Sequence, residues 1–182
     1  MTKAERDPSS IQPPQQARRI VVKLGSNVIA QPDAIDGALR MVSALRRLGA
    51  EVVLVSSGAV RLGMETLGMT QRPVDLPRLQ AAASVGQSRL MEVYGQRAAA
   101  HGLKVGQVLL VHADFGIRER FLNARAAAEA MIDLDVVPIV NENDAVGTSE
   151  IEFGDNDQLA TLVANLVEAD LLVLLTSVEG VL

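Results

Sequence analysis

Residues 19–26 read RIVVKLGS, and this stretch decides the fold class. Its apolar residues are consecutive rather than alternating, which is typical of a strand that is covered on both faces. Four later runs have the same character: EVVLVS at 51–56, KVGQVLLV at 104–111, VVPIV at 136–140 and LLVLLT at 171–176. We interpret these five runs as the strands of a mostly parallel sheet.

Helical patterns separate the strands. Apolar residues at three- and four-residue steps predict helices over 35–48 and 159–167, and Gly49 supplies a stop for the first of them. Segments rich in alanine predict two more helices, over 79–100 and 119–133. Strands that alternate with helices favour an α/β fold, a three-layer α-β-α sandwich with a mostly parallel central sheet.

Composition restricts the class of function. The 182 residues suffice for one domain with a proper core. The net charge is −5, lysine and arginine are scattered, and only 2% of the residues are aromatic, all of which argue against a nucleic-acid partner. The chain has no cysteine, which excludes disulfides and thiolate chemistry.

The two ends of the chain differ from its middle. Residues 1–17 are polar and contain prolines, so we interpret them as a flexible N-terminal tail and not as a signal peptide. The apolar runs are too short to span a bilayer, which favours a cytoplasmic location. Residues 18–182 form the predicted domain. We expect it to be C-terminally incomplete, because the chain stops directly after an apolar strand that nothing covers.

Ligands of open parallel sheets bind at the carboxyl ends of the strands. The first strand ends with Lys23, Gly25 and Ser26. A lysine in an apolar strand is costly unless its ammonium reaches an anion or water, and the small residues that follow suit a phosphate. The order of residues differs from that of a P-loop. The alternative is a lysine that extends to solvent before an ordinary turn.

The second strand ends with Ser56, Ser57 and Gly58, just before a predicted helix. Small hydroxyl residues and a glycine at a helix start present free N–H groups, which suit a carboxylate or a phosphate. The alternative is a serine that acts only as the helix N-cap.

Polar clusters mark three more positions. The sequence NEND at 141–144 and the sequence GDND at 154–157 have side chains that bind an ammonium group and polar oxygens together, although Asp155 or Asn156 can also simply cap a helix. Their spacing does not match a calcium loop, and we predict no metal site. Thr176 and Ser177 suit a nucleotide's sugar or phosphates, or an everyday turn. Tyr94 is interpreted as a packing residue.

Together these segments resemble the amino-acid kinase family and, within it, the branch that phosphorylates glutamate. The resemblance runs from about residue 19 to residue 182. It rests on VVKLGSNV, VSSGAV, LQAAASVGQSRLMEVYG, VGQVLL, RERFLNAR, VPIVNENDAVGT, FGDNDQLATLVA and LLT in that order. The combination of NENDAV with GDND is the most specific part.

The resemblance implies that ATP, with Mg²⁺ held by its phosphates, donates its γ-phosphoryl group to the side-chain carboxylate of L-glutamate in the first step of proline biosynthesis. It implies catalytic roles for Lys23, on the transferring phosphoryl group, and for Asp157, which organises catalytic lysines. It also implies two binding sets: Ser57, Gly58, Asp144 and Asn156 for glutamate, and Lys23, Gly25, Ser26, Thr176 and Ser177 for the nucleotide.

The chain departs from the family at Ser177, where an aspartate is usual, so a carboxylate is missing from the expected nucleotide contact. The family's glycine-rich nucleotide loop and second catalytic lysine are absent from these 182 residues, and we expect the fragment alone to be inactive. Proline as a feedback inhibitor and a homo-oligomer are further expectations. Two other functions stay open: a non-catalytic domain that binds glutamate or proline, and a related kinase with another acidic substrate.

Overall fold

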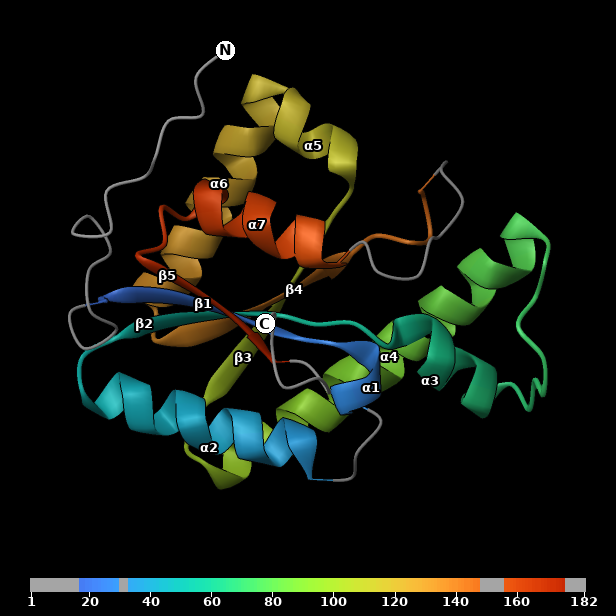
Figure 1. Cartoon of the computed structure of the whole chain (residues 1–182), viewed down its shortest axis with the longest axis horizontal. Helices are drawn as coiled ribbons and strands as arrows, with labels where there is room; N and C mark the ends of the chain where they lie inside the picture. Colours follow the sequence, from blue (N-terminus) through green and yellow to red (C-terminus); the bar gives the residue numbers. More distant parts are fainter. Residues whose placement is uncertain (1–16, 30–32, 148–155, 176–182) are drawn as a thin grey trace, which may run out of the picture.

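The computed structural model describes residues 17–29, 33–147 and 156–175, and it has a five-stranded sheet that lies between layers of helices (Figure 1). The strands lie in the order β3-β4-β2-β1-β5, and every neighbouring pair is parallel. Their bounds are β1 (Arg19–Leu24), β2 (Glu51–Val55), β3 (Lys104–Leu110), β4 (Val136–Glu142) and β5 (Leu171–Leu175).

Helices cover both faces of the sheet. In Figure 1, α2 and the C-terminal part of α4 lie below the sheet, whereas α5, α6 and α7 lie above it. The helix bounds are α1 (Ser26–Ile29), α2 (Ala34–Arg47), α3 (Ala59–Thr66), α4 (Leu76–Ala100), α5 (His112–Gly116), α6 (Arg118–Asp133) and α7 (Asn156–Leu166). The predicted three-layer sandwich with a parallel sheet is therefore confirmed.

Strand β1 shows why its apolar residues are consecutive. Ile20 and Val22 pack in the core cluster that contains residues of α2 and α4. Val21 packs instead in the cluster that contains residues of α6 and α7. Because successive side chains of a strand point to opposite faces, Lys23 lies on the same face as Val21, under α7.

The observed elements agree with the predicted ones to within a few residues, with one informative difference. Strand β4 continues to Glu142, because Asn141 and Glu142 pair with Leu109 and Leu110 of the neighbouring β3. The sequence had placed these two polar residues beyond the strand, since polar residues have low strand propensity. The predicted tail lies almost wholly outside the described residues, as does Thr176.

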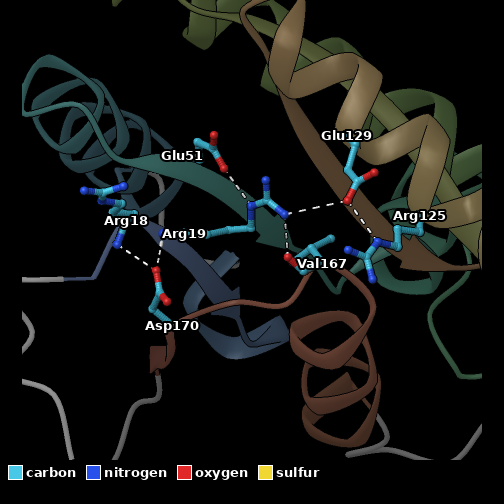
Figure 2. Close-up of polar contacts among 7 residues, drawn as sticks. All are labelled: Arg18, Arg19, Glu51, Arg125, Glu129, Val167 and Asp170. Atoms are coloured by element: carbon cyan, nitrogen blue, oxygen red, sulfur yellow. Dashed lines mark hydrogen bonds and ion pairs between the residues drawn. The ribbon is translucent and has the colours of Figure 1, made fainter.

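Arg19 ties three segments together at the amino-terminal edge of the sheet (Figure 2). Its Nε lies 2.6 Å from Glu51 Oε2 at the start of β2, and its Nη1 donates to the Val167 carbonyl at 2.7 Å. Asp170 Oδ2 accepts hydrogen bonds from the Arg18 and Arg19 N–H groups, each at 2.8 Å. These contacts align β1, β2 and β5 at the edge opposite the carboxyl ends.

Helices α3 and α4 pack backbone to backbone beside the sheet. A Cβ added to Gly86 of α4 would lie 1.7 Å from the Ala59 carbonyl oxygen, and one added to Gly63 of α3 would lie 1.7 Å from the Ala82 carbonyl oxygen. Only glycine permits this approach, which places the start of α3 against the middle of α4. In the part of the chain that the structure describes, no helix is long and apolar enough to cross a bilayer.

The α3–α4 contact gives the first prediction. Gly86→Ala should lower the free energy of unfolding by on the order of 3 kcal/mol, because the methyl group meets rigid backbone. Gly95→Ala in the same helix is the matched control. A Cβ there meets nothing within 4 Å, so this change should raise stability by about 0.5–1 kcal/mol. Urea unfolding of both variants checks this, and equal stabilities would contradict the described helix contact.

Candidate functional site

Lys23 forms an ion pair at the carboxyl end of β1. Its Nζ lies 2.6 Å from Asp157 Oδ1, on the first turn of α7. The Lys23 side chain is only 12% exposed, whereas that of Asp157 is 58% exposed. A half-exposed ion pair adds little to stability, but a mostly buried ammonium needs such a partner. Asp157 therefore holds the Lys23 ammonium at the carboxyl edge of the sheet, where parallel sheets bind their ligands.

Asn156 joins α7 to the end of β2. Its Nδ2 donates to the Ser56 carbonyl at 3.0 Å and to Ser57 Oγ at 2.5 Å. A carbonyl can only accept, so the bond to Ser56 fixes which way the Asn156 amide faces. Ser57 Oγ is the acceptor in its bond with Asn156, which leaves its own proton to donate elsewhere. The Ser57 hydroxyl is thus set up as a donor to an anionic ligand.

Two glycines bring the backbone close to these groups. A Cβ added to Gly25 would lie 3.6 Å from Lys23 Nζ, so the turn into α1, which begins at Ser26, passes beside the ammonium. Gly58 has φ +94°, a left-handed conformation that favours glycine, and it is the N-cap of α3. The alternative in which a serine caps this helix is therefore wrong.

Asp144 lies on the turn that follows β4. Burial raises the pKa of its carboxyl to about 6, the negative charge of Glu142 acts in the same direction, and Arg72 opposes both. The Gln80 side chain anchors this turn by donating to the Gly147 carbonyl at 3.0 Å. Within the described ranges, Asp144 makes no hydrogen bond or ion pair with the residues at the ends of β1 and β2.

The order of the strands decides how these groups are arranged. β2 lies between β1 and β4, so Ser57 and Gly58 separate the ammonium of Lys23 from the carboxylate of Asp144. Strands β1 and β4 lie about 10 Å apart, because neighbouring strands are about 4.8 Å apart. This arrangement suits a short ligand with an ammonium group at one end and carboxylates that reach Ser57 and Lys23.

The structure brings four of the predicted site residues into two contacting pairs, Lys23 with Asp157 and Asn156 with Ser57. Gly25, Ser26 and Gly58 adjoin them in the chain, and Asp144 lies at the same edge of the sheet. Thr176 and Ser177 lie outside the described residues. Over the described ranges, no group of three histidines or carboxylates gathers that could hold a metal ion.

Two residues of α4 beneath the site, Tyr94 and Gln87, make polar contacts that the sequence did not predict. Tyr94 is fully buried, as expected of a packing residue, but its hydroxyl also donates to Ser56 Oγ at 3.0 Å. Gln87 Oε1 accepts from Asn141 Nδ2 at 2.8 Å, and Gln87 Nε2 is buried with no partner in the described part of the chain. A usable signal existed, because Gln87 and Tyr94 lie seven residues apart on an otherwise small and apolar helix face.

The raised pKa of Asp144 gives the second prediction. The folded carboxyl, with a pKa of about 6, binds its proton more tightly than the unfolded one at 3.8, so stability falls as the pH rises through this window. Asp144→Asn should therefore stabilise the chain by on the order of 1 kcal/mol at pH 8, and by almost nothing at pH 4.

Denaturant unfolding at the two pH values checks the sign. Asp133→Asn serves as the control, because that carboxylate is exposed at the end of α6 and stays in water in both states. If Asp144→Asn destabilised the chain at pH 8, or acted equally at both pH values, Asp144 would not be the buried charge described here.

The chain is similar in sequence to a known family and to several known proteins. The amino acid kinase family matches residues 18–182. The chain is 51% identical over 172 residues to the glutamate 5-kinase of Azoarcus sp. (strain BH72), 49% identical over 175 residues to that of Pelobacter propionicus, and 51% identical over 170 residues to that of Burkholderia thailandensis. These alignments cover 91%, 91% and 90% of this chain. They cover 46% of each relative, so the chain spans about half the length of the curated relatives it matches. Because the family match extends over all but the first 17 residues, this chain belongs to the amino acid kinase family.

Proposed function

We propose that the chain binds L-glutamate at the carboxyl edge of its sheet, as part of a site that phosphorylates the glutamate side-chain carboxylate with ATP. One observation carries the proposal: the Lys23–Asp157 pair and the Asn156–Ser57 pair meet at neighbouring strand ends. The relatives named glutamate 5-kinase, at about half identity, support the choice of substrate.

The proposed reaction needs positioning more than covalent chemistry. A carboxylate oxygen of glutamate attacks the γ-phosphorus of ATP and forms an O–P bond. The bond between that phosphorus and the β,γ-bridging oxygen breaks, and ADP leaves with the electron pair. The product is glutamyl 5-phosphate, and no proton has to move. Catalysis then depends on alignment and on neutralising the charge of the transferring group.

Each proposed role follows from the chemistry of the side chain. The ammonium of Lys23 neutralises the transferring phosphoryl group, an effect worth on the order of 3 kcal/mol for one well-placed group. Asp157 orients that ammonium through their ion pair. The Ser57 hydroxyl and the N–H groups at the start of α3, beginning with Gly58, bind a carboxylate of glutamate. Asn156 holds Ser57 in place.

The remaining roles lie on either side of this centre. Asp144 pairs with the α-ammonium of glutamate, since its carboxylate lies one strand beyond Ser57. Gly25 and Ser26 approach the nucleotide phosphates next to Lys23, and Thr176 and Ser177, which follow β5 in the sequence, contact the nucleotide. Mg²⁺ belongs to the proposal only as a companion of the ATP phosphates. Among the described residues, no group of three histidines or carboxylates could form a separate cage for it.

The proposal has a physiological part as well. Glutamyl 5-phosphate formation is the first step of proline biosynthesis, in the cytoplasm. L-Proline carries an α-carboxylate and an ammonium centre like those of glutamate, so the same pocket accepts it as an inhibitor. We also propose that copies of the chain assemble into a homo-oligomer.

Titration calorimetry with L-glutamate gives the third prediction. The chain should bind L-glutamate, and Asn156→Ala should weaken binding at least tenfold, about 1.4 kcal/mol, because Ser57 loses the amide that orients it. N-acetyl-L-glutamate should bind far more weakly, because its acetylated nitrogen cannot pair with Asp144. Asn165→Ala, on the last turn of α7 and away from the strand ends, is the matched control.

The calorimetric outcomes separate the candidate functions. Absence of L-glutamate binding would contradict the proposal. Tighter binding of N-acetyl-L-glutamate than of L-glutamate would favour a related kinase with another acidic substrate. Glutamate binding without any binding of a non-hydrolysable ATP analogue would favour a non-catalytic glutamate-binding domain.

Lys23 gives the fourth prediction. Lys23→Ala should weaken binding of the ATP analogue at least tenfold, because its ammonium faces the phosphates. It should change L-glutamate affinity by less than about threefold, since one carboxylate keeps its donors at Ser57 and Gly58. Lys23→Arg keeps the charge and is the control. The reverse pattern, in which glutamate affinity is lost and nucleotide affinity is kept, would overturn the assigned role.

A further inference from the structure

A buried chain of hydrogen bonds runs from helix α4 to the strand end that carries Ser57. Tyr94 is fully buried, and its hydroxyl lies 3.0 Å from Ser56 Oγ. Ser56 is also fully buried, and its Oγ lies 3.2 Å from the Ser57 carbonyl oxygen. The chain therefore reaches the Ser57–Gly58 peptide from below, on the side away from α7.

The direction of the protons follows from the groups themselves. The Ser57 carbonyl can only accept, so the single proton of the Ser56 hydroxyl is used there. The phenol of Tyr94 must then be the donor to Ser56. Burial raises the pKa of Tyr94 to about 12, with a smaller opposing effect of the bond to Ser56, so the phenol keeps its proton at neutral pH. The chain has one direction, from Tyr94 through Ser56 to Ser57.

This chain orients the peptide that would meet a ligand. A trans peptide is planar, and its C=O and N–H point in opposite directions. Because Ser56 holds the Ser57 carbonyl toward the interior, the N–H of Gly58 points the other way. The left-handed φ of Gly58, +94°, belongs to the same turn. Asn156 holds the side chain of Ser57 from the opposite side.

We propose that Tyr94 is a positioning residue, which sets the direction of the Gly58 N–H and thereby the affinity of the site for a ligand carboxylate. This inference rests on the proposed function, because it takes glutamate as that ligand. The competing interpretation is that Tyr94 only fills the core beside Leu90 and Leu54, which belong to the same apolar cluster. The two interpretations differ in what the hydroxyl alone should do.

Tyr94→Phe removes that hydroxyl and keeps the ring. We expect it to weaken L-glutamate binding five- to thirtyfold by calorimetry and to shift the amide ¹H–¹⁵N signal of Gly58 in the ligand-free chain. Ser56→Ala interrupts the same chain one step later and should have an effect of the same size. The double variant should bind L-glutamate no more weakly than the single variant with the larger loss of affinity, because the three groups act in series.

Leu90→Val is the matched control, since Leu90 is fully buried on the same helix and belongs to the same apolar core cluster as Tyr94. It should lower the melting temperature while leaving both the glutamate affinity and the Gly58 signal unchanged. This control separates a loss of stability from a loss of orientation.

The inference would be overturned if Tyr94→Phe bound glutamate within twofold of the affinity of the original chain and left the Gly58 signal unshifted. Additive effects of Tyr94→Phe and Ser56→Ala would also overturn it. If the original chain does not bind glutamate, the proposed function fails. The shift of the Gly58 signal then tests the positioning role by itself. If Tyr94→Phe does not fold, the same shift is measured in Ser56→Ala.

Discussion

The first turn of α7 holds the ends of two neighbouring strands at once, and the rest of the site depends on this. Asn156 bonds to the segment after β2, and Asp157 pairs with Lys23 at the end of β1. A parallel sheet brings its strand ends to one edge, but it does not orient the side chains there. The two adjacent residues of α7 supply that orientation.

A second helix also contacts the ends of two strands through polar side chains. Helix α4 contacts Ser56 through Tyr94 and Asn141 through Gln87, and Ser56 N–H in turn donates to the Val140 carbonyl at 2.8 Å. At the opposite edge, the network around Arg19 fixes the alignment of the strands (Figure 2). Buried polar contacts of this kind rigidify a scaffold, and a rigid scaffold is what the proposed phosphoryl transfer would require.

The sequence predicted the layers of the fold well, because a strand covered on both faces, such as 19–24, leaves a clear apolar run. It also placed Lys23 and Ser57 at strand ends. It did not predict that Asn156 would bond to Ser57, 99 residues earlier, because that contact depends on the spatial order β3-β4-β2-β1-β5. Hydrophobic periodicity carries no information about strand order. The hydrogen bond of Tyr94 was not predicted for a similar reason, since its ring satisfies the apolar pattern and its hydroxyl finds a partner only in three dimensions.

A titration of the ¹⁵N-labelled chain with L-glutamate, followed by amide chemical shifts, tests most directly whether these strand ends form one pocket. The account predicts that the signals of Ser57, Gly58, Asp144 and Asn156 move together and report one dissociation constant, because a single molecule contacts the ends of β2 and β4 and the start of α7. Shifts confined to one of these segments, or different constants for different segments, would contradict a shared pocket.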